Sequence, residues 1–217
     1  MPAVNADASE DLGLRERKKL ATREALSWAA VRLALERGLD KVRVEAIAAA
    51  AGVSPRTYNN YFSSREEAIC AIATKRMRQV GTALRLRPPD EPLDEAVIRA
   101  IVDPYAGGGE PDKDMIRLIM SEPALRGEFI KAAVARETQL AEAIADRAGF
   151  DAERDLEPRL LAVVVSGASR VATVHWLRPD VHDPFATVTE AALRVVVPPV
   201  AEAIVTRSYA PARATRC

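Results

Sequence analysis

The chain has 217 residues, of which 48% are hydrophobic and 29% are charged, and its 31 basic and 31 acidic side chains cancel formally. This length and apolar content suffice for one small and one larger globular domain. The sequence contains only two cysteines, so we expect neither a disulfide framework nor a cluster of metal ligands.

The first residues are acidic and lack the basic and apolar segments of a secretory signal. We therefore expect residues 1–13 to form a disordered tail and the protein to be cytoplasmic. Residues 209–217, which include Cys217, are expected to form a second flexible tail. Cys70 lies inside a predicted helix and is interpreted as a small buried residue rather than a redox sensor.

The first predicted helix covers residues 22–38. Its apolar residues Leu26, Ala29, Ala30 and Leu33 recur with the spacing of one helix face, and Gly38 ends it. After residue 65, Glu66 and Glu67 begin another helix, where negative charge suits the helix dipole. Three helices thus lead into a fourth.

Residues 44–65 between them spell two short helices joined by a tight turn. An alanine-rich helix over residues 46–51 is followed by Gly52, which can adopt the left-handed conformation that ends a helix. Ser54 is a good N-cap, and Pro55 at the first helical position loses no hydrogen bond. This pattern is typical of a helix-turn-helix that binds DNA.

The second of these helices has two distinct faces. Tyr58 and Phe62 lie four residues apart and are expected to face the core. The outward set is a cation, a hydroxyl, two amides and a phenol, with no acid, and such groups bond phosphates and base edges. Those residues are Arg56, Thr57, Asn59, Asn60 and Tyr61. An ordinary solvent-exposed helix would show the same polar face. The choice between this alternative and a DNA-binding face therefore depends on the flanking segments.

The distribution of charge favours the DNA-binding interpretation. Between residues 13 and 65 the sequence has eleven Lys or Arg and five acids, a net charge of +6. The preceding tail and the remaining residues each have a net charge of −3. A basic N-terminal module on a slightly acidic body suits an anionic partner for one domain only.

The remainder of the chain also predicts helices. Their apolar residues recur with helical periodicity, and prolines and glycines mark their ends. The sequence shows no period-two alternation of the kind expected for a sheet, so the predicted fold class is all-α. An apolar run after residue 160 contains Ser166, Arg170 and His175, which favours a buried interface helix over a membrane span. The predicted helices cover residues 65–86, 93–105, 115–120, 123–150 with a break near Gly127, 158–177 and 184–205.

The motifs of residues 14–75 resemble the TetR family of bacterial regulators. The residues in that family's register are Glu36-Arg37-Gly38, Ile47-Ala48, Ala51-Gly52-Val53-Ser54, Thr57, Tyr61-Phe62 and Arg65-Glu66-Glu67. The resemblance implies a DNA-binding domain over residues 14–65 and a larger helical effector-binding and dimerisation domain over residues 66–208. It also implies a homodimer formed through segments 158–177 and 184–205, in which Pro198-Pro199 is expected to kink or break the last helix.

The resemblance also implies individual DNA contacts. Two reading helices about 34 Å apart would bind a palindromic operator in double-stranded DNA. Arg43 stands where a capping Ser or Thr is usual, and Asn59 replaces a ring with an amide that can pair with adenine. Phosphate contacts fall on Thr57, Tyr61 and Arg65, and base contacts on Pro55, Arg56 and Asn60, beside the capping Ser54.

We expect a repressor that a small, mostly apolar effector releases from DNA. Large or polar-tipped residues on presumed core faces are candidates for the effector site, although each is also an ordinary core residue. These candidates are Tyr105, Met115, Met120, Phe129, Phe150, His175 and Trp176. The alternative is an effector-independent regulator or activator. No catalytic, metal or cofactor motif stands out, so we expect no enzyme and no cofactor.

Overall fold

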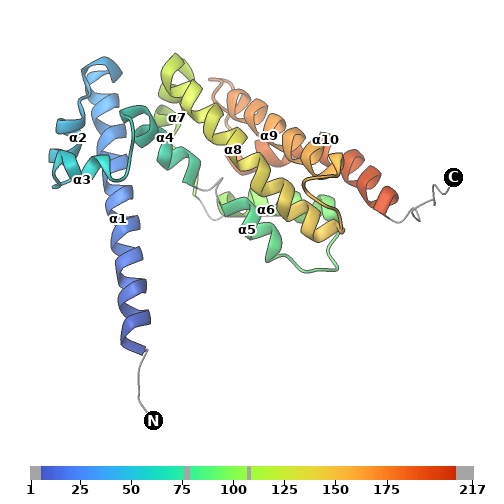
Figure 1. Ribbon diagram of the computed structural model, residues 1–217. Coiled ribbons are helices and arrows are strands. Elements are labelled where there is room, and N and C mark those ends of the chain that lie inside the picture. Colours follow the sequence, from blue (N-terminus) through green and yellow to red (C-terminus); the bar gives the residue numbers. More distant parts are fainter. Residues whose placement is uncertain (1–5, 76–78, 107–108, 209–217) are drawn as a thin grey trace, which may run out of the picture. The chain divides into compact units, whose positions relative to one another are not determined.

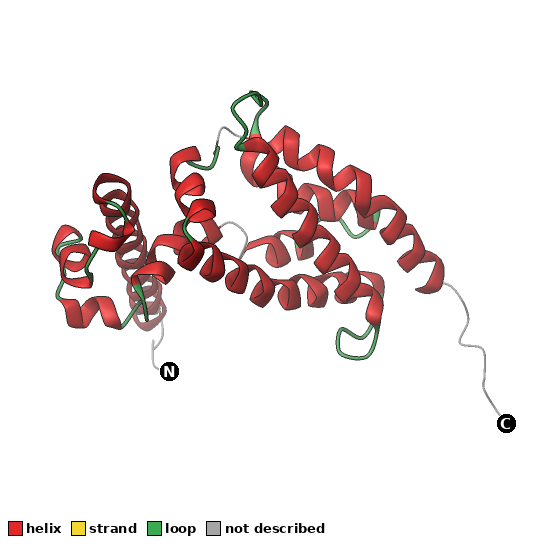
Figure 2. Cartoon of the chain, turned by 90° about the horizontal axis from the view of Figure 1, so that it is seen from above, coloured by secondary structure: helices red, strands yellow, loops and turns green. Residues whose placement is uncertain are grey.

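The computed structural model describes residues 6–75, 79–106 and 109–208, with side chains from residue 13 to residue 206. Across these ranges every regular element is helical, which confirms the predicted all-α class (Figure 1 and Figure 2). No helix in the described ranges is long and apolar enough to cross a membrane. The α-helices are α1 (Ala6–Arg37), α2 (Val44–Ala50), α3 (Pro55–Asn59), α4 (Arg65–Lys75), α5 (Val80–Arg85), α6 (Leu93–Ala106), α7 (Lys113–Ser121), α8 (Pro123–Ala148), α9 (Leu156–Trp176) and α10 (Phe185–Ser208).

The chain forms two compact units. The first comprises Met1–Ala73 and Leu118–Glu128, and the second comprises Thr74–Arg117 and Phe129–Cys217. This division differs from the predicted boundary after residue 65, because the first unit includes most of α4 and also takes in the beginning of α8.

The first unit is built around the packing of α1 on α2 and of α2 on α3. Leu26 from α1 and Ile47 from α2 are fully buried, as is Tyr58 from α3. The ring of Phe62 lies 5.7 Å from that of Tyr58. The predicted inward orientation of Tyr58 and Phe62 is therefore confirmed.

Helix α1 is longer than the sequence suggested. It begins at Ala6, whereas we expected a disordered tail over residues 1–13 and a helix from residue 22. The helix runs through Gly13, since a glycine inside a helix costs only about 1 kcal/mol relative to alanine. The expected flexible tail over residues 209–217 lies outside the described residues.

The second unit buries a core shared by five helices. α10 packs mainly on α9 and α6, and α5 and α8 complete the cluster. Each helix contributes at least one fully buried aliphatic residue to this core. Examples in chain order are Leu84, Val97, Ile144, Leu161 and Leu193.

The predicted helix over residues 65–86 is described as two helices, α4 and α5, and residues 76–78 between them lie outside the described part. Gly81 in α5 lies close to α8, because a Cβ atom added at this position would be 3.1 Å from the Gln139 carbonyl oxygen. Glycine therefore allows the two helix backbones to approach each other.

Two predicted interruptions do not break their helices. α8 continues through Gly127, and α10 continues through Pro198 and Pro199. In α10 the residue before the prolines, Val197, and the second residue after them, Ala201, are buried in the second unit's core. Tertiary burial thus holds the helical path that the local sequence disfavours.

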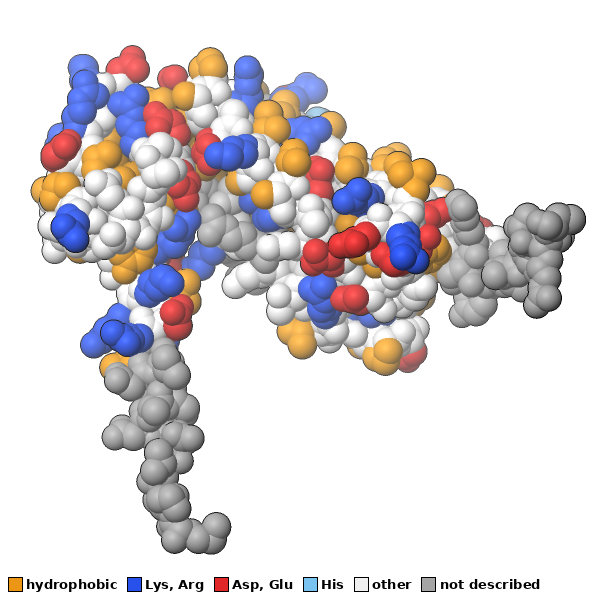
Figure 3. Space-filling view, in the orientation of Figure 1, with side chains coloured by type: hydrophobic (Ala, Val, Ile, Leu, Met, Phe, Trp, Pro, Cys, Tyr) orange, Lys and Arg blue, Asp and Glu red, His pale blue; other side chains and the backbone are white. Residues whose placement is uncertain are grey.

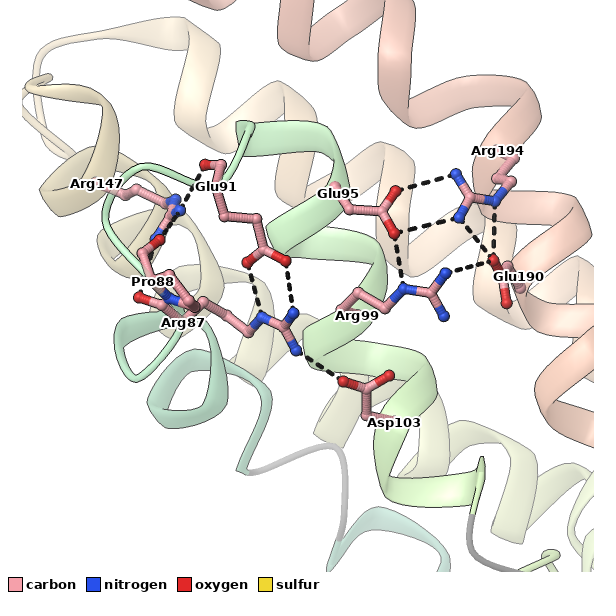
Figure 4. A network of polar contacts seen from close by, with 9 residues as sticks. All are labelled: Arg87, Pro88, Glu91, Glu95, Arg99, Asp103, Arg147, Glu190 and Arg194. Carbon is pink, nitrogen blue, oxygen red and sulfur yellow. Dashed lines mark hydrogen bonds and ion pairs between the residues drawn. The ribbon is translucent and has the colours of Figure 1, made fainter.

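A closed ring of ion pairs joins α6 to α10 in the second unit (Figure 4). Glu95 bonds both Arg99, at 2.7 Å, and Arg194, at 3.1 Å, and Glu190 bonds the same two guanidinium groups, at 3.2 and 2.7 Å. Hydrogen bonds from Arg194 and Arg99 hold the pKa of Glu95 below its usual value. The partly exposed pairs each contribute only about 0–1 kcal/mol, but the ring fixes the register of α6 against α10.

A second set of contacts organises the segment between α5 and α6. Arg87 bridges Glu91 and Asp103, and Arg147 of α8 donates to the carbonyl oxygens of Pro88 and Glu91 (Figure 4). The hydrogen bond from Arg87 lowers the pKa of Glu91. The connection is therefore anchored to α6 through Asp103 and to α8 through Arg147.

Candidate nucleic-acid interface

The turn between α2 and α3 has the predicted geometry. Gly52 has a φ angle of 69°, in the left-handed region that favours glycine. The N–H of Val53 donates to the carbonyl oxygen of Ala48 at 3.0 Å, which closes the end of α2. The side chain of Val53 is half-buried in the angle between the two helices.

α3 begins with the predicted cap. The Ser54 hydroxyl accepts a hydrogen bond from the backbone N–H of Thr57 at 3.1 Å, and its oxygen lies 2.9 Å from the Thr57 hydroxyl oxygen. Pro55 occupies the first helical position. The cap therefore satisfies one of the free N–H groups of α3 and also orients the Thr57 side chain.

The outer surface of α3 carries the predicted polar residues. Thr57 and Tyr61 are half-buried, and no acid occurs between residues 54 and 61. The exposed members of the surface are Ser54, Pro55, Arg56, Asn59 and Asn60. These hydroxyl, amide and guanidinium groups can bond phosphate oxygens and base edges.

Arg43 and Arg65, which are far apart in sequence, meet at the entrance to α2. Both donate to the carbonyl oxygen of Val42, from Nη1 at 3.4 and 2.8 Å respectively. Arg43 also donates to the carbonyl oxygen of Asp40, and Arg65 to the carboxylate of Glu66. Arg43 caps α2 without a side-chain hydrogen bond, as expected, and the two cations form a pair beside the reading unit.

Arg23 is a positioning residue that the sequence reasoning missed. Its Nη1 donates to the carbonyl oxygen of Tyr61 at 2.7 Å, and its guanidinium lies 4.2 Å from the centre of the Phe62 ring. The sequence did contain a sign of this role, because Arg23 lies three residues before Leu26, on the apolar side of α1. Arg23 ties α1 to the segment that directly follows α3.

Glu67 holds the junction between α3 and α4. Its carboxylate accepts from both the N–H and the hydroxyl of Ser63, and lies 3.5 Å from Arg23 Nη2. Burial alone would raise the pKa of Glu67, but these hydrogen bonds and the guanidinium outweigh burial and lower it. In return, the N–H of Glu67 donates to the Ser64 hydroxyl, which caps the start of α4.

Cys70 is buried in the first unit, as the sequence suggested. Its thiol donates to the carbonyl oxygen of Leu125, and burial, together with Glu128 and Glu66, raises its pKa to about 12. A protonated, inaccessible thiol of this kind is a packing residue.

The structure separates the predicted effector residues. Trp176, Met115 and Phe129 are buried, while Tyr105 and Phe150 are half-buried in the second unit. Met120 lies in the first unit, whereas the other candidates lie in the second. His175 does not face the core as predicted but is exposed, because it precedes the buried Trp176 and points about 100° away around α9.

Phe185, which was not predicted, brings two of those residues together. Its ring centre lies 4.8 Å from that of Tyr105 and 5.1 Å from that of Trp176, both edge-on. Lys113 Nζ lies 4.7 Å from the centre of the Trp176 ring. One turn along α10, the buried Thr189 hydroxyl has no hydrogen-bond partner within the described residues. We refer to Tyr105, Lys113, Trp176, Phe185 and Thr189 as the aromatic cluster.

Comparisons with known proteins match both parts of the chain. Residues 28–69 match the family described as bacterial regulatory proteins, tetR family, and residues 91–201 match the MftR C-terminal domain. The HTH-type transcriptional regulator TcmR of Streptomyces glaucescens is 34% identical over 178 residues, which are 77% of this chain and 79% of that protein.

Solved structures also share this fold. FadR of Thermus thermophilus, a TetR family repressor in complex with lauroyl-CoA, is 21% identical with a TM-score of 0.53, over 80% of this chain and 92% of that one. The fatty acid degradation regulator FadR of Bacillus halodurans is 18% identical with a TM-score of 0.54, over 82% and 95%. At these identities the likeness concerns the fold alone.

Glu67→Gln should destabilise the protein in a pH-dependent way. Because the folded pKa of Glu67 is lowered, its carboxylate stabilises the fold above its unfolded pKa of about 4.3, and this contribution is lost as the pH falls through the folded pKa. Urea unfolding followed by circular dichroism should show the largest difference from wild type near pH 7 and none in strong acid. Glu45→Gln, at an exposed position of α2, is the control at neutral pH. A pH-independent difference would contradict this role for Glu67.

Proposed function

Since the chain belongs to the TetR family of bacterial transcriptional regulators, we propose that it represses transcription by binding palindromic operators as a homodimer in the cytoplasm. The observation that carries this proposal is the exposed, acid-free polar surface of α3 on a rigidly capped helix. A small, mostly apolar effector then binds the second unit and lowers the affinity for DNA.

Each residue of the reading surface has a proposed role. Thr57 and Tyr61 bond phosphates and fix the register of α3 in the major groove. Pro55, Arg56 and Asn60 meet base edges, and Asn59 pairs with adenine. Ser54 supports these contacts by orienting Thr57, since the two hydroxyl oxygens are 2.9 Å apart.

Arg43 and Arg65 are proposed to grip the backbone beside the groove. Their shared acceptor, the Val42 carbonyl, places two cations at one point of the first unit. Arg43 is exposed and Arg65 half-buried, so Arg43 offers the more accessible phosphate contact.

The proposed dimer interface lies on α9 and α10. One face of α9 exposes apolar side chains at helical spacing, with exposed fractions between 47% and 67%. These side chains are Leu156, Leu160, Val163, Val171 and Val174. Gly167 lies on the same face, where no other described part of the chain would lie within 4 Å of an added Cβ, so a second helix can approach closely. On α10, Val195 is 75% exposed.

The aromatic cluster is the proposed effector site. Trp176 and Phe185 offer ring surfaces to an apolar ligand, and Lys113 supplies a cation. The Thr189 hydroxyl has no hydrogen-bond partner in the described part of the chain. Phe185 also begins α10, where its N–H donates to Glu110 at 2.9 Å. A ligand that moves Phe185 therefore acts directly on a helix of the proposed dimer interface.

In vitro selection from random duplex DNA should recover palindromes with half-sites about one helical turn apart. Asn59→Ala should relax selection at one base pair per half-site, at a cost of about 1–3 kcal/mol on the preferred sequence. Thr57→Ala and Tyr61→Phe should weaken binding to all sequences. Arg178→Ala, at an exposed cation of the second unit, is the control. Unchanged binding in the α3 variants would refute the proposed reading surface.

Val171→Arg should convert a dimer into a monomer. The wild type should show twice the 23.5 kDa chain mass by sedimentation at micromolar concentration. An arginine on the apolar face of α9 would be desolvated without a partner, so the variant should sediment as one chain. Leu86→Arg introduces the same charge at a site that is 81% exposed and outside this face. A monomeric wild type, or a dimeric Val171→Arg variant, would refute the interface.

Effector binding should alter the emission of Trp176. Trp28→Phe leaves Trp176 as the single tryptophan, and compounds from an aromatic and acyl panel that release DNA should change its fluorescence. Phe185→Leu should weaken such compounds about tenfold or more, a change of about 1.4 kcal/mol. Ile130→Leu, at an exposed position of α8, is the control. Compounds that release DNA without affecting Trp176 would locate the effector site elsewhere.

A further inference from the structure

The N-terminal half of α1 carries basic side chains that the reading surface does not use. Four of the five residues from 15 to 19 are Arg or Lys, and all four are exposed. Figure 3 shows such side chains gathered on α1 where it adjoins the residues drawn in grey. Since three acids precede this run in the sequence, the positive charge is confined to about one turn of helix.

Helical geometry assigns these cations to different faces of α1. With about 100° per residue, Arg15 and Lys19 lie within about 20° of the direction of Leu26, whereas Arg17 points the opposite way. Leu26 is fully buried in the first unit's core, and α1 packs on α2. Arg15 and Lys19 therefore extend the side of α1 that faces the helix-turn-helix, beyond the end of the core.

Arg23 marks the point of α1 that lies next to the end of the reading helix. Its 2.7 Å hydrogen bond to the Tyr61 carbonyl places that point of α1 beside the end of α3. Lys19 lies about 6 Å and Arg15 about 12 Å further along α1, one and two turns away. Arg and Lys side chains are long, and both positions are exposed within about two turns of the point where α1 meets the end of α3, so we expect them to reach phosphates beside the major groove that α3 occupies.

Existing contacts do not prevent such an interaction. Lys19 lies 3.8 Å from Glu16, but both side chains are about two-thirds exposed, so this pair is weak and screened by salt. Arg17 instead donates to the carbonyl oxygen of Gly13 on its own face of the helix.

We propose that Arg15 and Lys19 form a second DNA contact, a phosphate clamp on α1 that holds the backbone next to the groove read by α3. This inference rests on the proposed DNA-binding function and adds a sequence-independent contact to it. The clamp strengthens binding to operator and non-operator DNA alike, because phosphates carry no direct sequence information.

Salt titration of DNA affinity tests the clamp. The probes are a mixed-sequence duplex of about 30 base pairs and a selected palindrome of the same length, which accommodate two half-sites. Arg15→Ala with Lys19→Ala should reduce the slope of log affinity against log salt by about 1.8 per subunit on both duplexes, or about 0.9 for each lost phosphate contact. Arg15→Lys with Lys19→Arg should keep the wild-type slope.

The matched control removes two cations from other faces of α1. Arg17→Ala with Arg32→Ala changes the net charge equally, at two exposed positions about 180° and 120° away from Leu26, and should leave the slope close to that of wild type. Equal slopes for the two alanine pairs would overturn the clamp while leaving the reading surface intact. Failure of the wild type to bind either duplex would overturn the proposed function itself. Equal melting curves should confirm that every variant folds.

Discussion

A helix of five residues such as α3 makes too few internal hydrogen bonds to persist alone, so its direction depends on what holds its ends. Ser54 caps the first turn, and Tyr58 is buried against the core. Arg23 holds the segment beyond the last turn through the Tyr61 carbonyl. The orientation of the outward side chains of α3 is thus determined by inward contacts, and Glu67 links the same arrangement to the start of α4.

Features encoded by neighbouring residues were predictable from the sequence. The turn at Gly52 and the cap at Ser54 each depend on local backbone chemistry, and both are present. The predicted break near Gly127 is absent because a glycine inside a helix costs only about 1 kcal/mol. α10 continues through Pro198 and Pro199, where burial of nearby residues such as Val197 outweighs the local preference. The outward residues of α3 followed from helical periodicity. The meeting of Arg43 and Arg65 at one carbonyl, or of Phe185 with Tyr105, depends on long-range packing that periodicity does not specify.

α10 connects the features of the second unit. Phe185 at its start belongs to the aromatic cluster, and Glu190 and Arg194 belong to the ring of ion pairs that joins α10 to α6. Val195, which directly follows Arg194 in the sequence, is exposed on α10, the helix that we propose contacts a second copy of the chain. A displacement at the beginning of α10 would therefore be transmitted along a helix whose register against α6 is fixed, rather than absorbed locally.

The buried hydroxyl of Thr189, which has no hydrogen-bond partner among the described residues, has a consequence for how the proposed effector site would distinguish similar molecules. A buried hydroxyl without a partner costs about 1–3 kcal/mol, and a molecule that supplies an acceptor at this point recovers that cost. Each 1.4 kcal/mol is about tenfold in affinity, so two compounds of equal size that differ by a single oxygen atom would be separated by roughly one to two orders of magnitude. Fine chemical selectivity would then come from one hydroxyl group beside the aromatic rings of the cluster.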